Sequence, residues 1–152
     1  MTDKRAIKFA AVLLFVLRLA TFSLARKEET LPELVARADA APTDKQPDLY
    51  MEAAERQRKA ASDALKADRV EDFRTSLLDI LQFCDRAHKA AVASGKRTKN
   101  TEIKIRRISN YLKDIKLDAD PSNQPAVQQT IDQLEQFRTE LLRKMFGDKG
   151  HD

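Results

Sequence analysis

The sequence predicts an all-α protein: an up-down antiparallel four-helix bundle with a short N-terminal lid helix, preceded by a signal-peptide helix. Composition favours helices, because the 152 residues include only three Gly and five Pro, no Trp and two Tyr. Periodicity favours them too, since apolar side chains in residues 70–93 recur every three or four positions and so share one helix face. The residues of this face are Val70, Phe73, Leu77, Ile80, Leu81, Cys84, Ala87, His88 and Ala91, and Leu78 and Phe83 widen it. A face this broad needs neighbouring helices on more than one side.

Residues 1–25 have the three parts of a secretory signal peptide. A basic start precedes an apolar run at residues 9–17, and small residues stand at positions 23 and 25, where signal peptidase needs them. The basic residues of the start are Lys4, Arg5 and Lys8. We therefore expect an exported protein, periplasmic or extracellular, that touches a membrane only through this leader.

One residue of the leader leaves alternatives open. Arg18 interrupts the apolar segment, and a charge there disfavours a standard signal peptide. The alternatives are a retained membrane anchor formed by residues 7–25 and a mitochondrial-type presequence.

The basic character of the chain comes mostly from this leader. The chain holds 28 Lys and Arg against 24 Asp and Glu, a net charge of +4, and the leader alone has four basic residues against one acidic residue. The remainder is close to neutral, and Tyr111, the aromatic residue of its basic segment, belongs to the inward stripe rather than to the basic face. Both observations argue against a nucleic-acid partner.

A short lid helix and a loop are expected within residues 26–47. Thr30 and Glu33 have the spacing of a capping box, and Pro32 is tolerated in a first helical turn. Leucine, valine and alanine side chains give this helix a small apolar stripe, so we expect it to lie across the bundle as a lid.

Residues 48–147 are expected to form the bundle, and residues 148–152 a frayed tail. Gly95 stands where a glycine commonly ends a helix, and Ser122 or Asn123 is expected to cap the last helix. The four long helices are predicted at residues 48–67, 70–93, 99–117 and, after this cap, up to about residue 146.

The junction of the first two long helices resembles a known repeat unit. Residues 64–73 read ALKADRVEDF: small residues, a tight turn, and then an acidic and aromatic helix start. This is similar to the helix-turn-helix junction of a tetratricopeptide-like unit, over one hairpin of about forty residues. The usual Trp, Gly and trailing Pro positions are not filled and no second copy follows, so the resemblance implies an antiparallel hairpin rather than a peptide-binding solenoid.

A basic segment at residues 96–116 contains the candidate binding face. On a helical wheel its cations lie opposite the apolar stripe, and one isoleucine sits exposed among them. The candidate residues are Lys99, Ile103, Arg106, Arg107 and Lys113. Such a face suits an acidic protein or an anionic envelope component, and the alternative is an ordinary solvated helix surface.

Cys84 and His88 lie four residues apart and so share a helix face, with Asp85 three positions before the histidine. This spacing can chelate a metal, but a zinc or di-iron site needs more ligands than the segment offers. We expect a buried thiol and a packed histidine, and we keep a metal-binding or redox-responsive bundle as the alternative.

The sequence also bears on catalysis. It contains no glycine-rich phosphate loop, nucleophile elbow or zinc motif. We therefore expect no enzyme and no cofactor, but an exported helical bundle with a binding, adaptor or structural role in the cell envelope.

Overall fold

The computed structural model describes residues 28–147, and this part of the chain is helical throughout apart from its connections. The helices are α2 (Leu31–Ala40), α3 (Gln46–Lys66), α4 (Val70–Ser94), α5 (Thr98–Asp118) and α6 (Gln124–Phe146). The predicted all-α class is confirmed. The predicted signal peptide and the tail at residues 148–152 lie outside the described residues.

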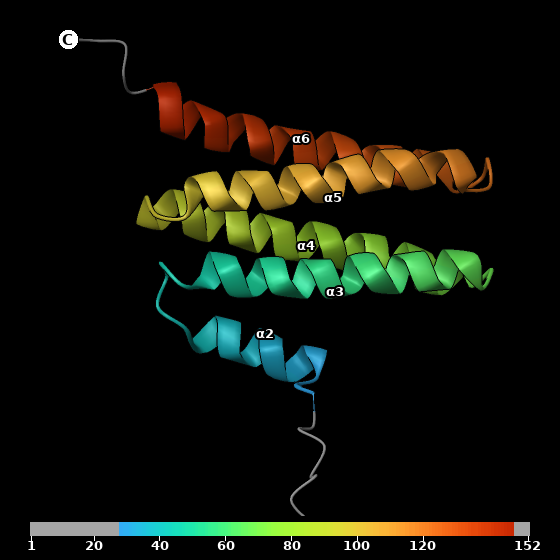
Figure 1. Cartoon of the computed structure of the whole chain (residues 1–152), viewed down its shortest axis with the longest axis horizontal. Helices are drawn as coiled ribbons and strands as arrows, with labels where there is room; N and C mark the ends of the chain where they lie inside the picture. Colours follow the sequence, from blue (N-terminus) through green and yellow to red (C-terminus); the bar gives the residue numbers. More distant parts are fainter. Residues whose placement is uncertain (1–27, 148–152) are drawn as a thin grey trace, which may run out of the picture.

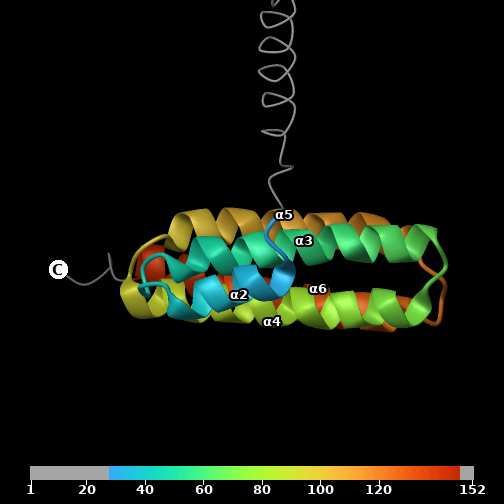
Figure 2. The ribbon, with the colours of Figure 1, turned by 90° about the horizontal axis from the view of Figure 1, so that it is seen from below.

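The four long helices form two antiparallel hairpins, α3–α4 and α5–α6, which pack against each other (Figure 1). Consecutive long helices run in opposite directions, so the predicted up-down antiparallel arrangement is confirmed. The two hairpins stack with α3 beside α5 and α4 beside α6, as the view from below shows (Figure 2). These neighbours across the two hairpins run in the same direction.

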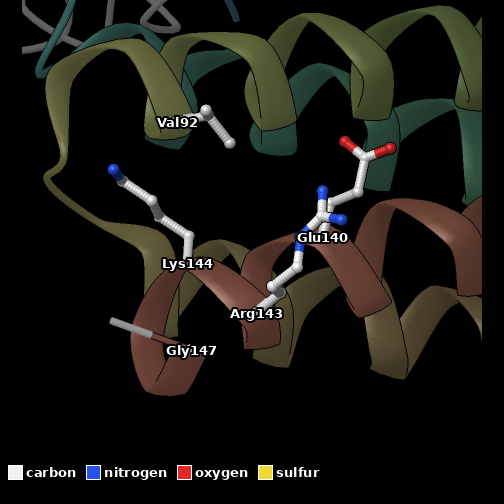
Figure 3. A pocket seen from close by; sticks show the side chains of 5 residues that line it. All are labelled: Val92, Glu140, Arg143, Lys144 and Gly147. Atoms are coloured by element: carbon white, nitrogen blue, oxygen red, sulfur yellow. The ribbon is translucent and has the colours of Figure 1, made fainter. Parts of the chain in front are cut away.

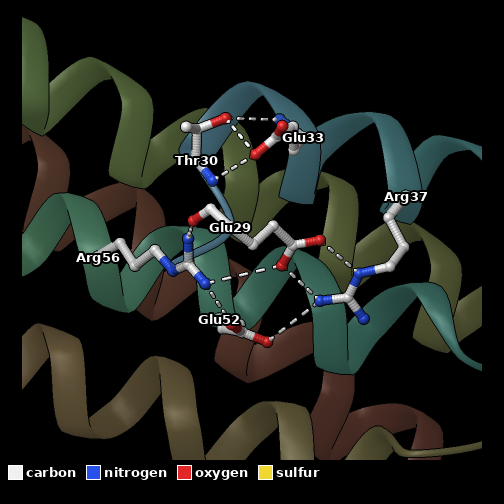
Figure 4. Close-up of polar contacts among 6 residues, drawn as sticks. All are labelled: Glu29, Thr30, Glu33, Arg37, Glu52 and Arg56. Atoms are coloured by element: carbon white, nitrogen blue, oxygen red, sulfur yellow. Dashed lines mark hydrogen bonds and ion pairs between the residues drawn. The ribbon is translucent and has the colours of Figure 1, made fainter. Parts of the chain in front are cut away.

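The short helix α2 packs on α3, in the flanking position expected of a lid, and reaches α4 through the ion pair between Asp39 and Arg86 at 3.1 Å. Its predicted capping box is present: the Glu33 backbone N–H donates to Thr30 Oγ1 at 3.4 Å, and the Thr30 N–H donates to Glu33 Oε2 at 2.7 Å. Arg37 and Arg56 then tie the start of α2 to α3 through the carboxylates of Glu29 and Glu52 (Figure 4).

The connections between the long helices follow from local backbone chemistry. Gly95 ends α4 with φ +64°, a left-handed conformation that glycine adopts without strain. The predicted side-chain cap of α6 is wrong. Asn123 occupies the cap position, but its side chain makes no capping bond, and its Oδ1 instead accepts a hydrogen bond from Arg74 Nε at 3.1 Å.

The core runs along the seam between the two hairpins. Small residues of α3, among them Ala54 and Ala61, are fully buried and let α3 and α4 approach closely, while Ile105, Leu112 and Leu134 fill the centre from α5 and α6. Leu78 was expected to widen the inner face of α4, and this is wrong, because its side chain is 68% exposed. The inner face of α4 is therefore narrower than its apolar pattern indicates.

Within residues 28–147 no helix combines the length and apolarity needed to span a bilayer.

Candidate functional site

The predicted basic face forms the outer side of α5. Ile105, Ile108 and Leu112 turn the opposite side of the helix into the core. Lys99, Arg106, Arg107 and Lys113 are exposed, as the helical wheel predicts, whereas Ile103 is partly buried, so the expectation of an exposed isoleucine is wrong. We keep the name "α5 face" for Lys99, Ile103, Arg106, Arg107 and Lys113.

Ion pairs with other residues reduce the charge of this face. Lys113 Nζ lies 3.0 Å from Glu135 Oε1 of α6, and Arg106 Nε lies 3.7 Å from Glu102 Oε1, one turn earlier. Further along the basic segment, Arg97 and Lys104 both pair with Asp48 of α3, at 3.4 and 3.0 Å. In the described part of the chain, Lys99 and Arg107 are the two cations of the α5 face without an acidic partner.

An apolar residue that the sequence reasoning missed lies on the same side. Leu117 is 84% exposed, the most exposed large apolar residue among those the structure describes. It follows Lys99 by eighteen positions, which is five full turns of an α-helix, so both point in the same direction. This spacing was available in the sequence, where Leu117 is the last residue of the helix predicted at residues 99–117.

A buried ion pair fixes the edge of the α5 face against α6. The Glu102 side chain is only 7% exposed and accepts two hydrogen bonds from Arg138, at 3.0 Å from Nε and 2.9 Å from Nη2. Arg138 Nη1 also donates to Glu135, whose other oxygen accepts from Ser109 and Lys113. α5 is therefore held at a set rotation, which fixes the direction in which its outer cations point.

The Glu135 carboxyl responds to this network. Its burial works to raise the pKa, but the hydrogen bonds from Ser109 and Lys113 and the charge of Arg138 outweigh burial, so the net effect is a lowered pKa. Glu135 is thus held as the carboxylate that binds the cations around it.

The second predicted group, Cys84 with Asp85 and His88, is not assembled as a site. Cys84 is fully buried, and this burial, together with the nearby charge of Glu55, raises the pKa of its thiol far above the usual range. Asp85 turns to Lys89, at 2.7 Å. Among residues 28–147 no three His, Cys, Asp or Glu side chains are grouped so as to hold a metal ion.

His88 packs between α4 and α6. Its ring stacks on Phe137 with centroids 5.1 Å apart, and its Nε2 lies 2.9 Å from Glu140 Oε2. That contact has the distance of an ion pair but not the alignment of a hydrogen bond, so neither ring nitrogen is hydrogen-bonded to the described residues. The predicted packed histidine is present.

Glu140 also lines an open hollow of about 330 Å³ between the C-terminal ends of α4 and α6. Figure 3 shows Val92 of α4 facing the side chains of α6 across it; the lining is completed by Arg143, Lys144 and Gly147. The hollow mixes both signs of charge with one valine.

Comparison with protein-family models, with curated proteins and with solved structures finds no match to this chain.

Proposed function

We propose that this protein is an exported, non-enzymatic helical bundle that acts as a binding or adaptor protein in the cell envelope. Its α5 face takes an acidic segment of a partner protein. The bundle serves to hold that face rigid, and no cofactor takes part.

The observation that carries this proposal is the state of Lys99 and Arg107. Neighbouring cations form ion pairs with Asp48, Glu102 and Glu135. Lys99 and Arg107 have no acidic partner among the described residues. Unpaired cations on a rigid surface attract an acidic partner and speed its encounter.

Apolar side chains on the same face support a protein partner rather than free ions. Leu117 is 84% exposed and Ile103 is partly exposed, and burying apolar side chains on binding contributes about 25 cal/mol per Å² of apolar surface. Lys99 and Leu117 lie about 27 Å apart along the helix at a rise of 1.5 Å per residue. A segment of four to five helical turns, carrying acidic residues beside one or two apolar ones, would match this length.

The location follows from the leader. Residues 1–25 support export to the periplasm or the extracellular space, and the alternative is a protein anchored in the membrane by residues 7–25.

The binding proposal is tested with the double variant Lys99→Glu/Arg107→Glu. The control is Lys45→Glu/Lys66→Glu, which makes the same change in net charge at exposed positions on α3 and its start. The probe is a synthetic amphipathic helix of Glu, Ala and Leu, titrated by fluorescence anisotropy in low salt. We expect at least tenfold weaker binding for the α5 variant and an unchanged affinity for the control.

Two results would contradict the proposal. Equal affinity of both variants for the peptide would make the α5 face an ordinary solvated surface. Binding to phosphatidylglycerol vesicles that the α5 variant loses, with no binding of the peptide, would replace the acidic protein by an anionic lipid surface.

The alternative function, a metal-binding or redox-responsive bundle using Cys84 and His88, stays a prediction. No contact described above favours it over the α5 face.

A further inference from the structure

Helix α2 occupies only part of the groove between α3 and α4. It has 10 residues against 21 in α3, which correspond to about 15 and 31 Å of helix at 1.5 Å per residue. Arg56 Nη1 donates to the Glu29 carbonyl oxygen at 2.5 Å, so α2 begins beside the middle of α3. Figure 2 shows α2 over one half of the hairpin and the other half uncovered.

The covered half shows how this groove holds a helix. Leu34 and Ala38 are fully buried, and Leu31 and Val35 are partly buried against the core. These four positions form an i, i+3, i+4, i+7 stripe, the pattern of an amphipathic helix seated in a groove. At the far end of α2, Asp39 accepts hydrogen bonds from Tyr50 of α3 and Arg86 of α4.

The uncovered half starts one residue after Arg56 and is hollow. Its volume is about 390 Å³, and small side chains of both helices form part of its lining. The lining residues with small side chains are Ala60, Ala64, Thr75 and Ser76. Small side chains let another helix come close, as the alanines of α3 already let α4 do.

The rim of this hollow is acidic. Its lining includes three carboxylates, those of Asp63, Asp72 and Asp79, and one cation, Arg69. Asp63 is paired with Lys59 at 2.9 Å and Asp72 with Arg69 at 2.8 Å, whereas Asp79 has no ion pair or hydrogen bond within the described residues. Partial burial raises the pKa of Asp79, because it removes water from the carboxylate and no cation replaces that stabilisation.

We propose that the open half of the α3–α4 groove docks a short basic amphipathic helix of a partner protein, in line with α2. The small side chains of Ala60 and Ala64 receive its apolar stripe, and its Lys or Arg side chains pair with Asp79 first and then with Asp63 and Asp72. Two observations select this occupant: the same groove already holds the short helix α2, and Asp79 in its open half has no cation to pair with. The inference concerns a different face from the α5 face and does not depend on it.

The experiment uses the full chain and a fluorescent 15-residue helical peptide of Lys, Ala and Leu as the probe. Its partner probe carries Glu in place of each Lys. We expect the Lys peptide to bind with an affinity that falls as salt is added, and the Glu peptide not to bind in this groove. Amide chemical shifts should change at residues 57–79 of α3 and α4 and not on the outer side of α5.

Variants locate the interaction. Asp79→Asn should weaken binding of the Lys peptide about tenfold, and the double variant Asp63→Asn/Asp79→Asn should weaken it further. The matched control Asp114→Asn/Asp118→Asn, which removes two exposed carboxylates of α5, should leave the affinity unchanged. Ala60→Trp keeps every carboxylate but fills the hollow, so it should abolish binding while the circular dichroism spectrum stays helical.

The proposal is overturned if the Lys peptide fails to bind, if Asp79→Asn and its α5 control behave alike, or if the Ala60→Trp variant still binds normally. Shift changes confined to another face would overturn it as well. None of these results bears on the Glu peptide at the α5 face, so this inference and the proposed function can fail separately.

Discussion

Arg138 of α6 places two of its nitrogens, Nε and Nη2, 3.0 and 2.9 Å from one carboxylate oxygen of Glu102 on α5. The Glu102 side chain is 7% and the Arg138 side chain 19% exposed, so water screens this pair poorly. The contact joins two helices whose interacting residues are 36 positions apart in sequence. Together with the contacts of Glu135 to Ser109 and Lys113, it sets the rotation of the α5 face.

Breaking this pair should therefore destabilise the fold more than breaking a surface pair. Arg138→Ala leaves the buried Glu102 carboxylate without its two hydrogen bonds and with only the 3.7 Å contact to Arg106, and we expect a loss of about 3 kcal/mol in the free energy of unfolding. Lys113→Ala, which removes a half-exposed pair with Glu135, should cost less than about 1 kcal/mol. Urea unfolding followed by circular dichroism measures both, and similar losses in the two variants would contradict the role given to Glu102.

The lowered pKa of Glu135 predicts a dependence of stability on pH. A carboxyl whose pKa is lower in the folded state stabilises the fold above its unfolded pKa, near 4.3, and this contribution disappears as the pH falls through the folded value. Glu135→Gln should be less stable than the parent at pH 7, and the difference should shrink between about pH 5 and pH 3. The exposed Glu71→Gln serves as the control and should differ little from the parent at any pH. A deficit for Glu135→Gln that stays constant down to pH 3 would contradict the pKa direction.

The core assignment is tested by two leucines with opposite surroundings. Leu134 is fully buried and Leu78 is 68% exposed. Leu134→Asp places an unpaired carboxyl in the centre of the bundle and should abolish cooperative unfolding. Leu78→Asp should melt like the parent, with a midpoint within a few degrees. A sharp, unshifted thermal melt of Leu134→Asp would show that the core lies elsewhere.

Burial of Cys84 predicts slow thiol chemistry. Its pKa is raised, so the native protein holds almost no thiolate, and the side chain is fully buried. A disulfide reagent such as dithionitrobenzoate should react only as fast as the protein unfolds, with a rate that rises with urea. The same sample titrated with Zn²⁺ should show no stoichiometric binding. Fast modification of the native protein together with one bound zinc would favour the metal or redox alternative.

Export is tested on the native protein. Cell fractionation combined with mass spectrometry of the N-terminus should find a mature chain that begins after Ala25, in the periplasmic or extracellular fraction. A chain that retains residues 1–25 in the membrane fraction would establish the anchored alternative. A cytosolic chain with Met1 intact would rule out both export and membrane anchoring.

The fold was largely predictable because its signals are local. The apolar period of residues 70–93, the Thr30–Glu33 capping box and the helix-ending Gly95 each act within a few residues, and all three are present in the structure. Asn123 shows where local signals fail. Its side chain bonds to Arg74, 49 positions earlier in the chain, and so does not cap its own helix.

The candidate site was predictable only in outline. Helical spacing correctly placed Lys99, Arg106 and Arg107 on one outer side. It could not reveal that Lys113 is paired with Glu135, because that partner comes from another helix. A helical wheel likewise predicts that Glu102 lies on the surface. Its burial depends on the ion pair with Arg138, which comes from α6 and leaves no signal in the sequence of α5. Tertiary pairing therefore decides which charges of the segment stay available.

The two hairpins stack in the same orientation, so the stack has two different ends. A translation along the stack superposes α3–α4 approximately on α5–α6, whereas in a ring of antiparallel helices every neighbour runs in the opposite direction. At one flank α2 covers half of the α3–α4 hairpin, whereas the opposite flank, formed by α5 and α6, has no such cover among the described helices. A further helical pair stacked beyond α5–α6 would meet a full-length hairpin, whereas one stacked beyond α3–α4 would first meet α2, so the two ends of the stack differ in what they can accept.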